Sequence, residues 1–174
     1  MIPFYCKMIR HLVSIRKPYY QDNRGFMHEI FLQKDLPLKK RKEFKIMQFN
    51  HSRSVIGVLR GIHISPWTKL VYVPNGMVQV VVVDCRKKSK SYGQYVSRIM
   101  GDGIGETLYI PPNCGFGFLT LSETADVVYA IGKYWRPLKE KGIIWNDPTL
   151  KIPWQVPQPI LSAKDKNNKT FAEL

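Results

Sequence analysis

The chain has 174 residues, of which 44% are hydrophobic, and a formal net charge of +14 at pH 7. This length predicts a single domain, residues 1–174, that can bury a core without disulfides or a structural metal. No stretch approaches the roughly 18 apolar residues of a membrane span, which excludes a membrane-spanning protein, and the charge predicts an anionic partner.

The first segment, residues 1–17, is basic and contains no acidic residue. It faintly resembles a transit peptide, but it lacks the apolar run of a secretion signal. We therefore interpret it as a first strand followed by a loop, and we expect a soluble, cytoplasmic protein.

Much of the excess positive charge lies in short runs such as Lys39-Lys40-Arg41-Lys42 and Arg86-Lys87-Lys88. Turn-forming residues flank both runs, and aromatic residues do not alternate with the basic ones, as they do in many nucleic-acid-binding surfaces. We interpret the runs as solvated loops and predict that the protein binds no nucleic acid and no membrane.

The central part of the chain has the pattern of an all-β domain. Short apolar segments of strand length alternate with turn signals such as Pro74-Asn75-Gly76, which is typical of a sandwich or barrel. Met77–Val83 is nearly all apolar, as expected of a strand covered on both faces, and Gln79 would point inward or toward a partner subunit. The predicted strands are Phe44–Phe49, Val55–Leu59, Leu70–Val73, Met77–Val83, Tyr95–Met100, Thr107–Ile110, Phe116–Leu121 and Val127–Ile131.

The C-terminal segment contains five prolines between Pro137 and Pro159, and its helical signals are weak. One helical turn could begin at Asp147–Leu150 and another at Ser162–Asp165. We expect this tail to be mostly irregular and to wrap around the barrel.

The cysteines and histidines give no sign of a disulfide or a metal site. Cys6, Cys85 and Cys114 have neither disulfide-framework nor CxxC spacing, which indicates a reducing compartment. The four histidines form no HxH pair and no HExxH motif, so we predict no metal. The common dinucleotide, P-loop and hydrolase motifs are also missing, and we predict no cofactor.

The residues most suggestive of chemistry are Arg60-Gly61-Ile62-His63. On a regular strand Arg60 and His63 would point to opposite faces, but a bulge at Gly61 could bring both to one cavity. Lys69 on the next strand could stabilise an enolate oxygen, and Tyr129 could reach the barrel interior as a phenolic acid. Asp165 matters if the tail folds back to orient His63.

Together these segments resemble the dTDP-4-dehydrorhamnose 3,5-epimerase family of the cupin superfamily. The resemblance spans nearly the whole chain. The segments that carry it are Asp22–Phe26 with Glu29, Gln48-Phe49-Asn50, Gly57–His63, Lys69-Leu70-Val71, Val83–Arg86, Ile110-Pro111-Pro112, Tyr129, Tyr134, Ile144–Pro148 and Leu161–Asp165.

The resemblance implies an antiparallel jelly-roll barrel, a homodimer, and a nucleotide-diphosphate-linked 4-keto sugar as substrate. It implies that His63 is the base, Tyr129 the acid, Lys69 the cation at the keto oxygen and Asp165 the partner of the base. The substrate-binding residues it implies are Arg24, Phe26, Glu29, Gln48, Asn50, Arg60, Phe116 and Tyr134.

Two segments depart from the family pattern. Phe116 stands where the family usually has a second histidine, and a phenylalanine can neither donate nor accept a hydrogen bond. The loop between His63 and Lys69 is also shorter than usual, which should reshape the cavity beside the sugar.

The sequence leaves several alternatives open. The enzyme could invert C3, C5 or both, it could be a 3,4-ketoisomerase, and its substrate could carry dTDP or GDP on a 6-deoxyhexose or a heptose. A catalytically reduced sugar-nucleotide-binding protein, suggested by Phe116, and a nucleic-acid binder, suggested only by the charge, are the alternatives outside isomerases.

Overall fold

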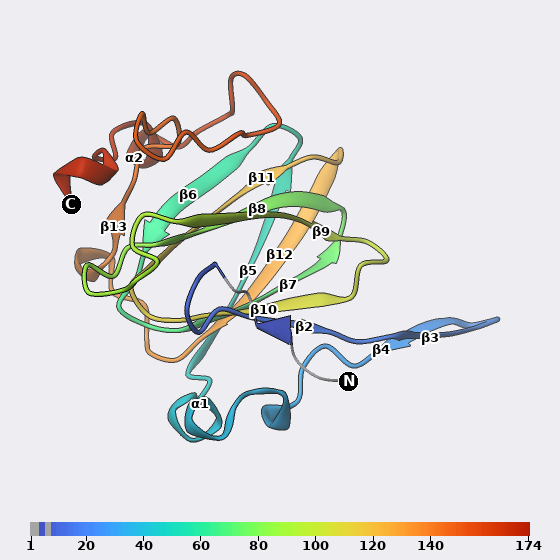
Figure 1. Ribbon diagram of the computed structural model, residues 1–174. Helices are drawn as coiled ribbons and strands as arrows, with labels where there is room; N and C mark the ends of the chain where they lie inside the picture. The colour runs from blue at the N-terminus through green and yellow to red at the C-terminus, as the bar shows by residue number, and fades with distance from the viewer. Residues whose placement is uncertain (1–3, 6–7) are drawn as a thin grey trace.

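Two antiparallel sheets face each other in the computed structural model, which describes residues 4–5 and 8–174 (Figure 1). One sheet has six strands, in the order β1 (Phe4–Tyr5), β2 (Val13–Arg16), β10 (Glu106–Ile110), β7 (Lys69–Asn75), β12 (Thr124–Ile131) and β5 (Gln48–Val55). The other has five, in the order β13 (Lys141–Gly142), β6 (Leu59–Ile64), β11 (Cys114–Thr120), β8 (Met77–Asp84) and β9 (Tyr95–Gly101). The all-β prediction is confirmed.

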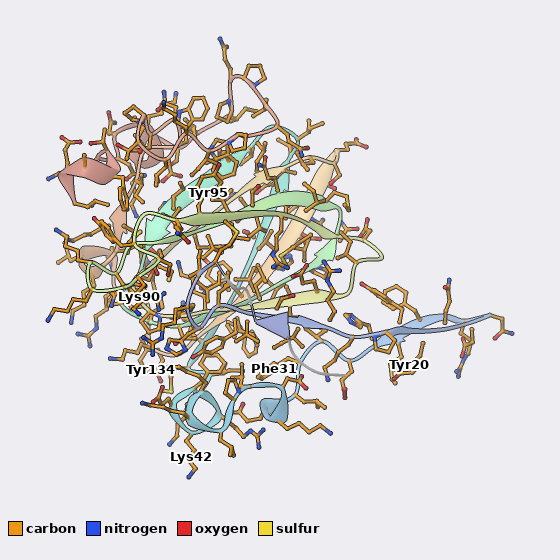
Figure 2. All side chains as sticks on the ribbon, in the orientation of Figure 1. Tyr20, Phe31, Lys42, Lys90, Tyr95 and Tyr134 are labelled. Atoms are coloured by element: carbon orange, nitrogen blue, oxygen red, sulfur yellow. The ribbon has the colours of Figure 1, made fainter. Side chains whose placement is uncertain are left out.

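The remaining elements lie outside the two sheets. A separate hairpin, β3 (Tyr19–Asp22) with β4 (Gly25–His28), extends well away from the barrel (Figure 1). The helices are short: α1 (Leu38–Glu43), α2 (Ala163–Lys166) and three 3₁₀ turns at Gln33–Asp35, Pro137–Lys139 and Phe171–Glu173. Figure 2 shows Tyr20 on the projecting hairpin, away from the side chains that fill the barrel.

The core lies between the sheets because alternate residues of each strand point inward. In β8, Val78, Val80 and Val82 belong to this central cluster, whereas Val81 and Val83 pack on the outer face. The prediction that this strand is covered on both faces is therefore correct.

The outer face of the five-stranded sheet is covered by the C-terminal tail. Ile143, Leu150 and Phe171 from the tail are buried against Val81 and Val83 of β8.

Gln79 lies on this side of β8. Its amide nitrogen donates to the backbone oxygen of Pro153 at 2.9 Å, and its amide oxygen accepts from the backbone N–H of Gln155 at 2.9 Å. The buried amide thus fixes the tail of its own chain.

The start of the barrel differs from the prediction. Phe44–Phe49 is not one strand: α1 ends at Glu43, Phe44 is buried, and strand β5 begins only at Gln48. The run Lys39–Lys42 lies within α1 and not in a loop, although it stays on the surface. Val55–Leu59 is not a strand either: Val55 ends β5, Leu59 begins β6, and the residues between them form a turn in which Gly57 has a φ of +79°.

A bulge interrupts β6 at Gly61–Ile62. On the paired strand β11, Phe116 opposes His63 and Phe118 opposes Arg60, so β6 advances three residues where β11 advances two. The extra residue places Arg60 and His63 on the same side of the sheet. Gly61 has a φ of +122°, and a Cβ atom there would lie 2.6 Å from the Cα of Gly117.

Within residues 4–5 and 8–174, no helix has the length and apolar character needed to cross a membrane. Cys85 and Cys114 are free cysteines. Cys6, which was also predicted to be unpaired, lies outside the described residues.

We predict that Gly61→Ala destabilises the fold more than Gly25→Ala, although the two glycines have nearly equal φ values of +122° and +124°. Both substitutions strain the backbone, but only Gly61 faces a backbone atom, because nothing lies within 4 Å of a Cβ at Gly25. The free energy of unfolding, measured by urea denaturation, should fall by at least about 1 kcal/mol more for Gly61→Ala. Equal losses would show that the close approach to β11 is not a constraint.

Candidate active site

A cavity of about 470 Å³ opens inside the barrel and is lined by both sheets and by the tail. The six-stranded sheet contributes Lys69 from β7 and Tyr129 from β12, and the five-stranded sheet contributes His63 from β6. Asp165 comes from α2 in the tail. The structure therefore brings together the four residues that were predicted to be catalytic.

His63 and Asp165 form a short contact, with His63 Nε2 2.6 Å from Asp165 Oδ1. The N–H of Gly61 donates to the other oxygen of this carboxylate at 3.4 Å, and the Ser162 hydroxyl accepts from the backbone N–H of Asp165 at 3.1 Å. Burial acts to raise the pKa of Asp165, but the hydrogen bonds from His63, Gly61 and Ser162 outweigh it, so this pKa is lowered. Because an ionised carboxylate only accepts hydrogen bonds, Nε2 carries a proton and Nδ1 is left as the basic nitrogen.

Glu140 is a further charged residue of this cavity, which the sequence analysis missed. One of its oxygens accepts from the Ser65 hydroxyl at 2.9 Å and lies 3.8 Å from Lys69 Nζ. The other lies 3.3 Å from Lys164 Nζ and 4.0 Å from His63 Nδ1. Burial acts to raise the pKa of Glu140, but Lys69 and His63 together with Ser65 and Lys164 lower it, so the carboxylate is ionised.

Lys69 is almost completely buried, and burial lowers its pKa to about 8. Glu140 opposes this shift and Lys164 adds to it. The ammonium therefore loses its proton far more easily than an exposed lysine would, yet it is still charged at neutral pH.

Tyr129 and Phe116 are two of the aromatic residues that line the cavity. Their ring centroids are 6.4 Å apart, and Lys69 Nζ lies 5.4 Å from the centroid of the Phe116 ring. Burial raises the pKa of Tyr129, with Glu140 adding to the shift, so the phenol stays protonated. A protonated phenol and a charged ammonium thus face the same space.

Arg60 lines the cavity, and its Nε donates to the Ser54 hydroxyl at 2.9 Å. Gln48 and Asn50, which were predicted to bind substrate, lie on the edge strand β5 and are not among the described residues that line the cavity, and Gln48 Nε2 donates to Asn50 Oδ1 at 2.7 Å. Tyr134, which was predicted to bind substrate, lines a neighbouring groove, whereas the next residue, Trp135, lines the cavity. The reason is that the loop after β12 turns Tyr134 outward, where it is largely exposed.

The other predicted binding residues lie on or beside the projecting hairpin. Arg24 is paired with Asp22 at 2.6 Å, and Glu29 is paired with Lys17 at 2.8 Å. Phe26 is 64% exposed and packs edge-on against Tyr19. Arg24, Phe26 and Glu29 are not among the described residues that line the cavity of their own chain.

Among residues 4–5 and 8–174, no three His, Cys, Asp or Glu side chains lie close enough together to hold a metal ion. Most of the charged side chains that line the cavity are paired with one another, as His63 with Asp165 and Lys69 with Glu140.

Comparisons with known proteins agree on one family. The sequence profile of dTDP-4-dehydrorhamnose 3,5-epimerase matches residues 7–173. The dTDP-4-dehydrorhamnose 3,5-epimerase of Pseudomonas aeruginosa is 38% identical over 158 residues, which cover 88% of this chain and 87% of that protein. That of Escherichia coli is 35% identical over 171 residues, covering 95% and 92% of the two chains.

Solved structures give the same result for the fold. The dTDP-6-deoxy-D-glucose-3,5-epimerase RmlC of Legionella pneumophila, in complex with dTDP-4-keto-L-rhamnose, aligns with a TM-score of 0.86 and 34% identity. The alignment covers 98% of this chain and 92% of that one. NovW, a 4-keto-6-deoxy sugar epimerase of Streptomyces spheroides, aligns with a TM-score of 0.92 and 28% identity, over 98% and 87%. The predicted cupin-type barrel is thus confirmed.

We predict that Lys69 Nζ titrates near pH 8 in the folded protein, as followed by NMR of the lysine side chains, and that two substitutions move this pKa in opposite directions. Glu140→Gln removes the nearest negative charge and should lower the pKa, because the ammonium loses its partner. Lys164→Gln removes a neighbouring positive charge and should raise it. Shifts of the same sign in both variants would contradict the arrangement of charges described here.

Proposed function

The chain belongs to the dTDP-4-dehydrorhamnose 3,5-epimerase family, and we propose that its cavity inverts C3 and C5 of a dTDP-linked 4-keto sugar through an enolate. One observation carries the proposal most strongly: His63 and Tyr129 stand on opposite sheets of the barrel, on β6 and β12. A planar enolate bound between them would have a base on one face and an acid on the other, which is what inversion of a carbon centre requires.

In this proposal His63 Nδ1 removes the proton from the carbon next to the ketone. Asp165 fixes the ring with Nε2 protonated and stabilises the imidazolium that forms. The Gly61 N–H donates to the Asp165 carboxylate and the Ser162 hydroxyl accepts from the Asp165 backbone N–H, so a strand and a helix cooperate to orient one base although Gly61 and Asp165 are 104 residues apart.

The Lys69 ammonium then stabilises the charge that develops on the ketone oxygen. Its burial makes this interaction stronger than it would be in water, because the local dielectric constant is low. The pKa of about 8 also allows the ammonium to be a good hydrogen-bond donor to an oxyanion while remaining charged at pH 7.

Tyr129 donates its phenolic proton to the opposite face of the enolate carbon. Phe116, beside Tyr129, contributes no hydrogen bond, so His63 and Tyr129 have to serve both C3 and C5. Arg60 is the cation of the cavity that is best placed for the diphosphate, since it is exposed, whereas Lys69 is buried and Lys164 is paired with Glu140.

The dTDP carrier is proposed from the relatives, whose names specify dTDP sugars, in preference to the GDP heptose that the sequence had left open. We also propose a cytoplasmic location, supported by the free thiols of Cys85 and Cys114.

We predict that His63→Ala abolishes incorporation of deuterium from D₂O into a dTDP-4-keto-6-deoxy sugar, because no base remains on that face. Tyr129→Phe should keep exchange at C3 and C5 but block inversion, since the proton then returns from the side from which it left. NMR of the sugar reads both outcomes at each carbon. Inversion by Tyr129→Phe at the normal rate would remove Tyr129 from the role of acid.

The positions of Arg24, Phe26 and Glu29 support a homodimer. The hairpin that carries Arg24 and Phe26 projects from its own barrel with exposed apolar side chains, Phe26 at 64% and Met27 at 68%. Strand β5, which carries Gln48 and Asn50, is an edge strand of the six-stranded sheet. Unpaired edge strands accept further strands readily, and a two-fold dimer would exchange such contacts in both directions.

We therefore propose that the hairpin of one subunit lies beside β5 of its partner and that Arg24 completes the partner's cavity. This arrangement explains why Arg24, Phe26 and Glu29, which the family resemblance implies as substrate-binding residues, lie on or beside a hairpin that does not reach the cavity of its own chain.

We predict that Arg24→Ala and His63→Ala, each impaired alone, complement one another after subunit exchange. Each mixed dimer has one site with both an intact His63 and an intact Arg24, so a one-to-one mixture should recover about a quarter of the wild-type sites. Absence of recovery, with mixed dimers verified by mass spectrometry, would place Arg24 outside the partner's site.

Two single substitutions, one in the proposed interface and one outside it, test the interface itself. Phe26→Asp should shift the sedimentation of the protein toward the monomer, whereas Leu38→Asp, at a residue of similar exposure on α1, should not.

A further inference from the structure

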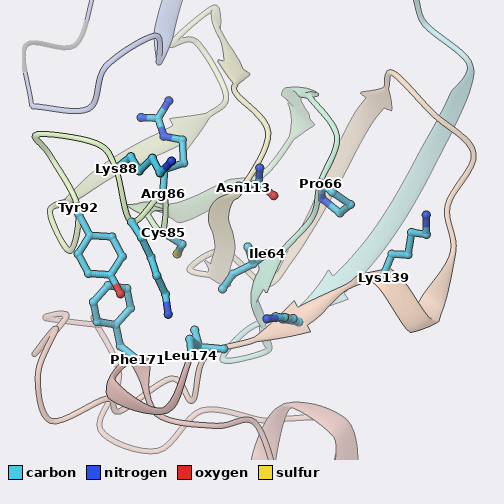
Figure 3. Close-up of a pocket in the computed structure, with 12 residues that line it drawn as sticks. Ile64, Pro66, Cys85, Arg86, Lys88, Tyr92, Asn113, Lys139, Phe171 and Leu174 are labelled. Atoms are coloured by element: carbon cyan, nitrogen blue, oxygen red, sulfur yellow. The ribbon is translucent and has the colours of Figure 1, made fainter.

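A second cavity, of about 500 Å³, lies on the other side of the segments that form the catalytic cavity. The end of β6, the connection between β8 and β9, strand β13 and the C-terminal residues surround it. Figure 3 shows Tyr92 and Phe171 on one side of this cavity, Lys139 on the other, and Ile64 between them. Its volume is within the range of about 300–1,000 Å³ that is typical of small-molecule sites.

The two cavities are separated because successive side chains along the same segments point to opposite sides. His63 lines the catalytic cavity and Ile64 lines the second one, because successive residues of a strand point to opposite faces. In the same way Glu140 lines the catalytic cavity while Lys139 and Lys141 line the second one. A ligand in one cavity therefore does not occupy the other.

The second cavity is strongly basic. Among the described residues that line it, none is an Asp or Glu, and five are cationic: Arg86, Lys87, Lys88, Lys139 and Lys141. Arg86 is neutralised by Asp84, whose carboxylate it contacts at 2.7 Å. The four lysines are exposed and have no ion-pair partner within the described part of the chain. A multivalent anion would relieve their mutual repulsion.

The wall opposite Lys139 is aromatic. The rings of Tyr92 and Phe171 are 5.0 Å apart, and Phe171 is buried whereas Tyr92 is 39% exposed. Phe171 thus supports a tyrosine ring that is open to the cavity, and such a ring can stack against a planar base.

We propose that this second cavity is a binding site for a nucleoside diphosphate. The diphosphate contacts Lys87, Lys88, Lys139 and Lys141, and the base stacks on Tyr92. The site is distinct from the catalytic cavity and does not depend on the epimerase activity.

Calorimetric titration of the whole protein with ADP, and separately with inorganic pyrophosphate, tests the proposal. The K87A/K88A double variant should weaken ADP binding at least about tenfold, because two phosphate contacts are lost. The control K39A/K42A removes the same charge from α1 and should change it less than about twofold. Equal weakening in both variants would show that ADP binding depends only on the net charge of the protein, and it would overturn the proposal.

Further substitutions test which residue contacts the base of ADP and which of the two cavities binds ADP. Tyr92→Ala should weaken ADP binding at least about fivefold and leave pyrophosphate binding unchanged, whereas Tyr20→Ala, at an exposed tyrosine of the hairpin, should change neither. Arg60→Ala, in the catalytic cavity, should leave ADP binding intact. Loss of ADP binding in Arg60→Ala but not in K87A/K88A would place ADP in the catalytic cavity and overturn the proposal, as would pyrophosphate binding as tightly as ADP.

Discussion

The active site depends on one extra residue in strand β6. Without the bulge at Gly61–Ile62, Arg60 and His63 would point to opposite faces of the sheet, because they are three residues apart. The bulge requires a glycine, since β11 passes too close for a side chain at position 61. It also directs the Gly61 N–H toward Asp165, so the irregular backbone that turns the base into the cavity also helps to hold the partner of that base.

The regular part of the barrel could be predicted from the sequence because burial on one or both faces leaves a clear pattern. The apolar run of β8 is an example, since both its faces are covered and almost every residue is buried. The apolar pattern did not predict the strands before β6 correctly. Phe44 is buried, but Phe49 is exposed on the outer face of β5, so an apolar residue at each end of a segment did not mean a strand between them. Only the tertiary contacts show that Phe44 is buried and that Phe49 is exposed.

The catalytic candidates that lie on strands, His63, Lys69 and Tyr129, were named because their residue types suit the chemistry and the family resemblance implied their roles, and the structure places all three in one cavity. Glu140 was not, since it lies between a 3₁₀ turn and a short strand and nothing in its neighbours indicates that it points inward. Glu140 points to the catalytic cavity while its neighbours Lys139 and Lys141 point to the other side, but this alternation is informative only when the chain is known to pass along the cavity wall. The return of Asp165 to His63 likewise requires the course of the whole tail.

The net charge of +14 is a poor guide to the catalytic chemistry, because it is not concentrated where the catalytic candidates lie. The catalytic cavity is lined by Arg60, Lys69 and Lys164 against Glu140 and Asp165, so it is nearly neutral apart from His63. Such balance is needed in a buried site, where an unpaired charge is costly, and it leaves the ammonium free to respond to a developing oxyanion. The uncompensated lysines lie on solvated surfaces, where charge costs little, and a binding site for a phosphorylated ligand can form there without altering the catalytic residues.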